Sequence, residues 1–234
     1  MIRVHHVLLV VALLVLTACS GMGVKSSNLS QSAATDLDLF PEVVMFLVDG
    51  ERNCSAVMIE TNIALTSAHC IVDYGQMSLK TSTGVESYVI KYEAHPLFTE
   101  PSWSNDIAVV MVEDDLIESH ERPFIWTAAI TSSDFASVVV AVGWSGGQQN
   151  IYESWLLSVI EQDIILFLAD PGHLWFGDSG GGTYIIRDQM LWLTGVNTLV
   201  FSSRSTRQPL ASGSTSIAQH LSWIYSVTDE WDME

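Results

Sequence analysis

The sequence has few basic residues, few cysteines and none of the common cofactor motifs. Its 234 residues include nine Lys and Arg against 27 Asp and Glu, a formal charge of -18 at pH 7. This balance disfavours nucleic acids and anionic membrane surfaces as partners, because their phosphate groups would be repelled. No metal-ligand cluster, phosphate loop or dinucleotide fingerprint occurs, so we expect no metal and no cofactor. Hydrophobic residues make up 48% of the chain, which is enough for a buried core.

The longest apolar run, Val7 to Leu16, follows Arg3 near the N-terminus. It is too short to cross a bilayer as a stable helix and is typical of a secretory signal, here residues 1–18. The ending LTAC at Cys19 resembles the lipobox of bacterial lipoproteins, in which the cysteine thiol receives a diacylglycerol. A chance cysteine after a generic signal is the alternative.

Residues 19–39 are rich in Ser, Gly and Ala, which is typical of a flexible tether. With a lipid on Cys19, the protein would be exported and would face the periplasm or the cell exterior. Its contact with the membrane would then be the lipid anchor alone, unless it is released. The sequence says nothing about the oligomeric state.

Only three cysteines occur, at positions 19, 54 and 70. If Cys19 carries a lipid, Cys54 and Cys70 remain, and an oxidising compartment would favour their pairing. A loop of that size gives about 3 kcal/mol of stabilisation in a chain-entropy estimate.

Beyond the tether, the apolar segments are short and rich in β-branched residues. They are 43–48, 87–90, 107–112, 137–142, 163–168, 183–186 and 191–196. Short runs separated by turn residues favour strands, and the lack of helices between them favours an all-β sandwich or barrel. The region from 122 to the following turn-rich ITSSDF marks a boundary between two β halves. Ile217, Leu221 and Ile224 recur at helical spacing and predict one amphipathic helix near the C-terminus.

The segment LWFGDSGGGTY, residues 174–184, places Ser179 among four glycines and one carboxylate. Such a run indicates either a flexible surface turn or a main chain that must turn sharply or approach another group closely. A serine hydroxyl becomes a good nucleophile only with a base, and the base needs a third group to orient it. A catalytic role for Ser179 therefore requires a histidine and a carboxylate in suitable settings elsewhere in the chain.

His69 and Asp106 have such settings. His69 follows the apolar run IALT and adjoins Cys70, although a packed histidine beside a disulfide would look the same. Asp106 precedes the most apolar strand, where an isolated carboxylate would be costly unless paired, and a strand-capping role is its alternative. The other histidines beyond the signal have no comparable context: His95, His120, His173 and His220.

The segments TSAHC, SNDIAVV and FGDSGG, in this order, resemble the three signatures of chymotrypsin-like (trypsin-family) serine proteases. The order His, Asp, Ser separates that family from subtilisins and α/β-hydrolases. The resemblance extends through AVGWS, TGVNTLV and SWIYSV and covers about residues 40–226. It implies an all-β fold of two six-stranded antiparallel β-barrels with the active site between them and a C-terminal α-helix. The implied ranges are 40–128 and 129–213 for the barrels, 214–227 for the helix and 228–234 for an acidic tail.

The resemblance also implies roles for single residues in the hydrolysis of protein or peptide substrates. Ser179 would attack the acyl carbon, His69 would move the proton and Asp106 would orient the imidazole. The main-chain N–H groups of Gly177 and Ser179 would form the oxyanion hole.

The chain departs from the family at its activation signal. Family members usually need a freed N-terminus, often Ile-Val-Gly-Gly, whose ammonium inserts beside the aspartate preceding the nucleophile, here Asp178. No such tetrapeptide precedes Phe40, and cleavage in the tether would release the domain from its lipid. Either Asp178 has another partner, or an unrecognised cleavage frees a soluble enzyme, or the oxyanion hole is badly formed.

The expected substrate pocket also departs from trypsin. His173 stands six residues before the nucleophile, where trypsins have aspartate, so a preference for Arg or Lys is unsupported. Thr198 and Val200 lie on the strand that would wall the pocket, and the branched Val200 resembles the elastase arrangement, which favours small apolar P1 residues. A buried His173 could instead pair with an acidic P1 side chain. Trp175 replaces a cysteine that many relatives use in a second bridge.

Two alternatives remain open. GDSGG also fits the nucleophile elbow of lipases and esterases, for which Asp188 and His220 could nominally complete a triad. The segments before Ser179 show no alternation of strands and helices, which counts against that fold. The second alternative is a non-catalytic binding module on a protease scaffold, suggested by the missing activation peptide.

Overall fold

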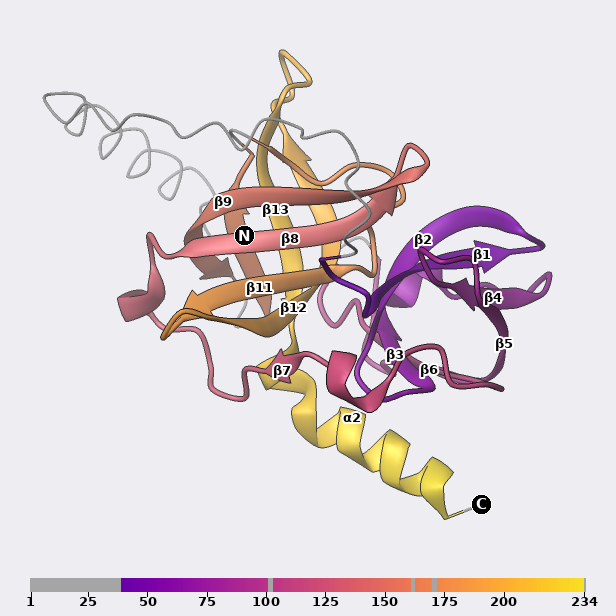
Figure 1. Cartoon of the computed structure of the whole chain (residues 1–234). Coiled ribbons are helices and arrows are strands. Elements are labelled where there is room, and N and C mark those ends of the chain that lie inside the picture. The colour runs from indigo at the N-terminus through magenta and orange to yellow at the C-terminus, as the bar shows by residue number, and fades with distance from the viewer. Residues whose placement is uncertain (1–38, 101–102, 161–162, 170–171, 234) are drawn as a thin grey trace, which may run out of the picture. The chain divides into compact units, whose positions relative to one another are not determined.

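The computed structural model describes residues 39–100, 103–160, 163–169 and 172–233 (Figure 1). The expected signal peptide, the lipid site at Cys19 and nearly all of the tether lie outside these ranges. Within them, no helix has the length and apolar character needed to cross a membrane.

The first half of the described chain forms a closed six-stranded barrel. Its strands are joined in the order β1-β2-β3-β6-β5-β4, and each neighbouring pair is antiparallel. Their bounds are β1 (Val43–Val48), β2 (Glu51–Met58), β3 (Ile63–Thr66), β4 (Met77–Lys80), β5 (Glu86–Ala94) and β6 (Ala108–Val112). The short 3-10 helix η1 (Ala68–Cys70) directly follows β3.

The second half forms a sheet in the order β11-β8-β9-β10-β13-β12-β7, and the pairing of β11 with β12 closes six of these strands into a second antiparallel barrel. Their bounds are β8 (Val138–Ser145), β9 (Gln148–Ile160), β10 (Ile164–Leu168), β11 (Gly182–Arg187), β12 (Met190–Ser202) and β13 (Pro209–Ser216). Figure 1 shows the two barrels beside each other, the first in indigo to magenta and the second in salmon to gold. The prediction of two six-stranded antiparallel barrels is confirmed.

The link between the barrels carries η2 (Ser119–Glu121), the short strand β7 (Phe124–Ile125) and η3 (Ser132–Asp134). β7 already pairs with β12 of the second barrel, in parallel, with Phe124 opposite Trp192. The chain therefore joins the second barrel's sheet before residue 128, where the sequence placed the end of the first barrel.

The unbroken apolar runs in the sequence come from strands that are buried on both faces. In β1, Val43, Met45 and Leu47 belong to an apolar cluster shared by both barrels, whereas Val44 and Phe46 belong to the core of the first barrel. Side chains alternate between the faces of a strand, so a strand between two cores needs apolar residues at every position.

The apolar pattern of the sequence does not predict β9 and β13, because these strands lack such runs. In β9 many side chains are exposed or half-buried, and its first residues are Gln, Gln and Asn. β13 buries small polar residues: Ser212, Ser214 and Thr215 are all fully buried. Their hydroxyls form hydrogen bonds near the candidate site, so a buried strand here looks hydrophilic in sequence.

The C-terminal helix α2 (Ile217–Asp232) has the predicted apolar stripe. Ile217 and Ile224 lie in the shared apolar cluster, and Leu221 packs against it. The helix begins after β13, which holds residues 214–216, and continues through most of the segment expected as an acidic tail. The range of 214–227 was therefore wrong at both ends.

The disulfide joins Cys54 of β2 to Cys70 of η1, as predicted, across 16 residues of sequence. Their Cα atoms lie 6.1 Å apart, and both residues are buried in the first barrel's core. The bond ties the turn that carries His69 to the neighbouring strand.

We expect the double variant Cys54→Ala/Cys70→Ala to lose about 3 kcal/mol of unfolding free energy, because the unfolded chain regains the freedom that the closed loop removes. Urea denaturation of the variant and of the oxidised wild type measures this difference. Wild type treated with reductant is the control and should approach the variant. Equal midpoints for the variant and the oxidised protein would show that the bond adds no stability.

Candidate active site

His69 and Asp106 meet because β3 and β6 are neighbours. The two strands pair antiparallel with Thr66 opposite Ala108, so the end of one lies beside the start of the other. Asp106 precedes β6 and is fully buried, and its two carboxylate oxygens both accept hydrogen bonds from His69. The main-chain N–H of His69 donates to Oδ1 at 2.9 Å, and ring Nδ1 lies 2.7 Å from Oδ2.

These contacts set the tautomer of His69. An ionised carboxylate only accepts hydrogen bonds, so Nδ1 must carry the proton, and in the neutral ring Nε2 is left as an acceptor. Trp103 contacts the ring edge-on, with ring centroids 5.4 Å apart. His69 is thus held by its own backbone, by a carboxylate and by an aromatic neighbour.

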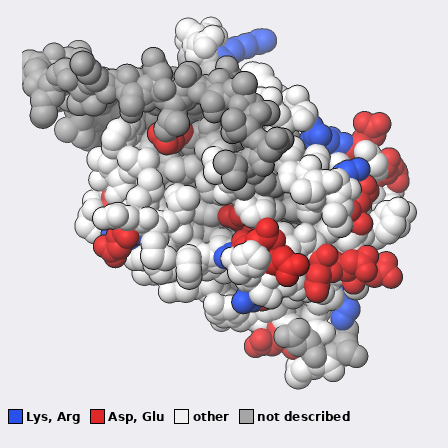
Figure 2. Space-filling model, in the orientation of Figure 1, with Lys and Arg blue, Asp and Glu red and all other residues white. Residues whose placement is uncertain are grey.

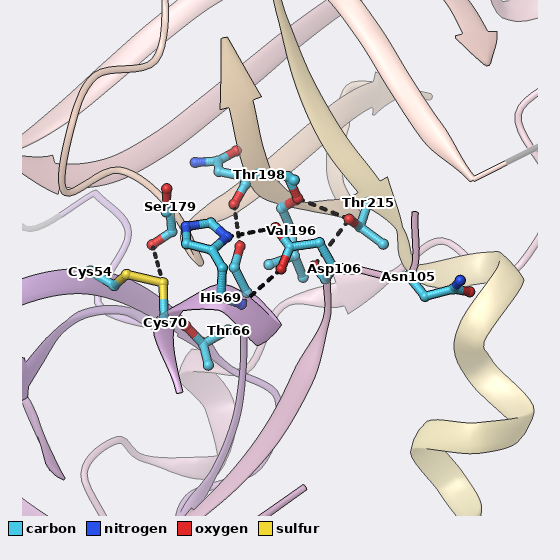
Figure 3. A network of polar contacts seen from close by, with 12 residues as sticks. Cys54, Thr66, His69, Cys70, Asn105, Asp106, Ser179, Val196, Thr198 and Thr215 are labelled. Carbon is cyan, nitrogen blue, oxygen red and sulfur yellow. Dashed lines mark hydrogen bonds and ion pairs between the residues drawn. A yellow bond between two sulfur atoms is a disulfide. The ribbon is translucent and has the colours of Figure 1, made fainter. Parts of the chain in front are cut away.

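Hydroxyl groups of the second barrel surround Asp106 (Figure 3). Thr215 of β13 donates from Oγ1 to the main-chain oxygen of Asp106 at 3.1 Å. Thr198 shares a 2.8 Å hydrogen bond with the Thr215 hydroxyl, and it lies 3.1 Å from the carbonyl oxygen of Val196. The first barrel therefore supplies the carboxylate, and the second barrel holds its backbone.

The turn that carries Ser179 requires its glycines. Gly177 and Gly180 have φ angles of +100° and +86°, which favour glycine. A Cβ on Gly180 would lie 2.0 Å from the carbonyl oxygen of Ser55, and one on Gly181 would lie 2.1 Å from that of Val142. The segment is a tightly packed turn, so the interpretation as a flexible surface turn is wrong.

Ser55 attaches this turn to the first barrel. Its N–H donates to the carbonyl oxygen of Ser179 at 2.7 Å, and its hydroxyl donates to that of Gly177 at 2.8 Å. The same hydroxyl accepts from the N–H of Trp144 at 2.7 Å. Ser55 is fully buried and was not identified from the sequence, in which its position beside Cys54 is the only signal.

Asn197 attaches the same turn to the second barrel. Its side-chain amide donates to the carbonyl oxygens of Val142 and Asp178, at 2.9 and 3.2 Å. Its main-chain oxygen accepts from the N–H of Gly180 at 2.7 Å. Nothing in the sequence distinguished this buried asparagine from the other residues of its strand.

The main-chain N–H groups along the turn fall into two sets. Those of Asp178, Gly180 and Gly181 donate to carbonyl oxygens of the fold. Those of Gly177 and Ser179 have no acceptor among the residues that the structure describes. The two groups left without an acceptor are the pair expected to bind an oxyanion.

Ser179 lies next to the disulfide. Figure 3 draws it on the opposite side of the His69 ring from Asp106. Its carbonyl oxygen lies 3.9 Å from Sγ of Cys70. A ring nitrogen of His69 and the sulfurs of Cys54 and Cys70 lie within 4.8 Å of one another, but both sulfurs belong to the disulfide and so offer no thiolate to a metal.

Asp178, the expected partner of a freed N-terminus, is fully buried and has other partners. Its Oδ2 accepts from the N–H of Trp175 at 2.7 Å and from the Tyr152 hydroxyl at 3.1 Å. Oδ1 is buried and has no hydrogen-bond partner in the described part of the chain. Burial raises the pKa of Asp178, and the donors around it and nearby His173 only partly offset this. Burial, together with the charge of Asp178, raises the pKa of Tyr152 to about 12, so the phenol keeps its proton.

The expected pocket residues differ in their exposure. His173 is half-buried, with its ring 5.4 Å from that of Trp175, and Val200 is exposed. Thr198 is buried, and its hydroxyl is engaged with Val196 and Thr215 instead of facing a substrate. Phe176, just before the turn, is 91% exposed and was not identified from the sequence.

Asp188 and His220, which the nucleophile elbow of lipases and esterases would need, have other surroundings. Asp188 is exposed in the turn between β11 and β12, with a φ of +51°. His220 is buried in α2, where its Nε2 lies 2.7 Å from Oδ1 of Asp163. Among the described residues, the strands form two antiparallel barrels and not the parallel α/β sheet that such an elbow requires.

We expect Asp178→Asn to stabilise the protein at pH 7, because the amide removes a buried charge and keeps an oxygen for Trp175 and Tyr152. The raised pKa means that the folded state binds this proton more tightly than the unfolded state does. The protein therefore keeps its full stability below the usual carboxyl pKa, where Asp178 is protonated. It loses stability as the pH rises through the folded pKa, because Asp178 then becomes a buried charge. Thermal unfolding between pH 3 and 8 should show a Tm gain for the variant at high pH that vanishes in acid. A variant that is less stable than wild type at pH 7 would contradict this.

Comparison with known proteins agrees with this geometry. The family model for trypsin matches residues 31–166, which include His69 and Asp106 and end before Ser179. The chain is similar to trypsin alpha of Drosophila erecta and of Drosophila melanogaster, with 27% identity to each over 130 residues. Each match covers 51% of this chain and 50% of the relative, so the chain spans about half the length of these relatives. With a match over more than half of its length and two closed six-stranded barrels, the chain belongs to the trypsin family.

Proposed function

We propose that this protein is a serine endopeptidase in which Ser179 is the nucleophile, His69 the general base and Asp106 the orienting carboxylate. The observation that carries the proposal is the pairing of a fully buried Asp106 with Nδ1 of His69 at 2.7 Å. It leaves Nε2 able to accept a proton on the side where Ser179 lies in Figure 3.

In the first step, Oγ of Ser179 forms a bond to the substrate carbonyl carbon while Nε2 of His69 takes the hydroxyl proton. The imidazolium then gives this proton to the leaving amine as the C–N bond breaks, which leaves an acyl ester on Ser179. Water, activated by the same nitrogen, hydrolyses the ester and restores the serine. Asp106 stays ionised throughout and stabilises the imidazolium.

The N–H groups of Gly177 and Ser179 would bind the negative oxygen of the tetrahedral intermediate. Both are free of acceptors among the described residues, and Ser55 and Asn197 hold the turn that presents them. A donor of this kind contributes about 3 kcal/mol to transition-state stabilisation.

We further propose that this turn does not depend on an inserted ammonium. Tyr152 and the N–H of Trp175 already donate to Asp178, which closes the turn from within the fold. Of the alternatives raised by the missing activation sequence, another partner for Asp178 is the one that these contacts favour.

The proposed substrates are proteins or peptides with a small apolar P1 residue. Val200 carries a branched, exposed side chain on β12 two positions after Thr198, which would narrow the pocket. An acidic P1 residue paired with His173 is the competing specificity. A peptide library separates the two by the residue found before the cut.

We expect Ser179→Ala to abolish labelling by a fluorophosphonate probe and to lower kcat for peptide cleavage by about a million-fold, because the variant has no nucleophile. Labelling read by mass spectrometry and turnover of the same peptide library measure both effects. Ser119→Ala, at an exposed serine of η2, is the matched control and should leave both unchanged.

Two outcomes would overturn the proposal. Wild type that is folded yet neither labels nor cleaves any peptide would instead indicate a binding module on a protease scaffold. Labelling that persists in Ser179→Ala would place the nucleophile elsewhere.

We also propose, from the sequence of residues 1–19, that the protein is exported and anchored by a lipid on Cys19. Signal cleavage and acylation would give a mature chain that begins at Cys19 with the added mass of its lipid. Mass spectrometry of the N-terminal peptide from cells measures this, with Cys19→Ala as the control. An unmodified peptide that retains residues 1–18 would contradict both parts of the proposal.

A further inference from the structure

A second buried carboxylate–histidine pair lies in the fold, and the proposed chemistry uses neither residue. Asp163 precedes β10 and is 7% exposed, and His220 lies in α2 and is 5% exposed. Oδ1 of Asp163 lies 2.7 Å from Nε2 of His220. Removing such a pair from water is costly unless further hydrogen bonds satisfy its remaining polar atoms. The other contacts of Asp163 and His220 therefore show which parts of the fold the pair holds in place.

The second oxygen of Asp163 reaches the segment that carries Asp106. Its Oδ2 accepts from the main-chain N–H of Asn105 at 2.5 Å. Asn105 directly precedes Asp106 and has a φ of +59°, in the left-handed region, which asparagine adopts more readily than most residues other than glycine. Its side-chain amide donates to the carbonyl oxygen of Leu97 at 3.2 Å. The left-handed turn that enters Asp106 is therefore held by contacts to Asp163 and Leu97, which lie outside the turn.

The main chain around Asp163 is itself held in place. Its carbonyl oxygen accepts from the N–H of Ser216, at the junction of β13 and α2, at 2.7 Å. Its N–H donates to the carbonyl oxygen of Ile160 at 3.1 Å. With both main-chain groups bonded and Oδ1 paired to His220, Asp163 can place Oδ2 accurately.

A third group, His95, packs against the pair. Its ring lies 4.8 Å from that of His220 and 4.7 Å from that of Trp223, between centroids. Burial and the neighbouring His220 lower the pKa of His95, while Asp163 opposes the shift. His95 also donates its N–H to the carbonyl oxygen of Ile107, just after Asp106. The cluster thus joins α2 and the start of β10 to both sides of Asp106.

We propose that Asp163, held by His220, is a positioning residue for Asp106. It acts through the N–H of Asn105 and moves no proton. It fixes the left-handed turn that directs the Asp106 carboxylate toward His69, and it links that carboxylate to the C-terminal helix. The inference rests on the proposed function, because Asp106 is the residue that it positions.

The test compares Asp163→Ala with Asp163→Asn. The alanine variant loses the acceptor for Asn105, and we expect kcat to fall about 10- to 100-fold with KM little changed, since small misplacements in a catalytic site have effects of this size. The asparagine variant keeps an acceptor oxygen and should recover most of the lost kcat.

A readout independent of activity is the NMR signal of the His69 Nδ1 proton, which the hydrogen bond to Asp106 shifts downfield. We expect this signal to move or broaden in Asp163→Ala and to return toward its wild-type position in Asp163→Asn. This readout separates the two proposals: if wild type proves inactive, the proposed function fails, while the NMR comparison still tests the positioning.

Asp134→Ala is the matched control. Asp134 is also buried, caps η3 through Thr131 and pairs with Arg187, so its loss should destabilise the fold without touching the candidate site. Equal losses of kcat in Asp134→Ala and Asp163→Ala would overturn the proposal, as would wild-type kcat and an unshifted proton in folded Asp163→Ala. If Asp163→Ala does not fold, His220→Gln replaces it and should lower kcat in the same direction, and a folded His220→Gln with wild-type kcat and signal would overturn the proposal.

Discussion

The candidate site depends on one buried carboxylate. Asp106 is closed off from water, so its charge must be balanced by hydrogen bonds, and both of its oxygens are used by the ring and the main chain of His69. Leaving such a group unpaired would cost several kcal/mol. The fold itself therefore needs this contact, and the imidazole orientation follows from it.

Each barrel supplies one half of the candidate site, and hydrogen bonds from the other barrel hold that half in place. The first barrel carries His69 and Asp106, while Thr215 of the second barrel donates to the Asp106 backbone. In the opposite direction, Ser55 of the first barrel donates to the Ser179 turn, which belongs to the second. Neither barrel holds its own candidate residues alone, because their alignment is a property of the shared interface.

Asp178 is a second buried carboxylate, and its contacts lie within the turn that carries Ser179 and on β9. A buried carboxylate with a raised pKa stores unfavourable energy, and the N–H of Trp175 and the phenol of Tyr152 offset part of it. Tyr152 keeps its proton at neutral pH, so it remains a donor there. These contacts hold the turn from within the fold, at some cost in stability, and the N–H groups of Gly177 and Ser179 have no acceptor among the described residues.

Sequence patterns alone determined the all-β class of the fold, and the motifs that resemble the trypsin family pointed to the three residues of the candidate triad. Runs such as 43–48 and 107–112 are apolar throughout because they lie between two cores, and the motifs around His69, Asp106 and Ser179 are local in sequence. The apolar pattern did not predict strands such as β13, because buried hydroxyl groups that bond to distant partners look hydrophilic in sequence. The roles of Asn197, Tyr152 and Asp163 had no local signal for the same reason, and the only signal for Ser55 was its position beside Cys54. Their roles come from partners that lie far away along the chain, and only the packing of the two barrels and α2 brings these partners within hydrogen-bond distance.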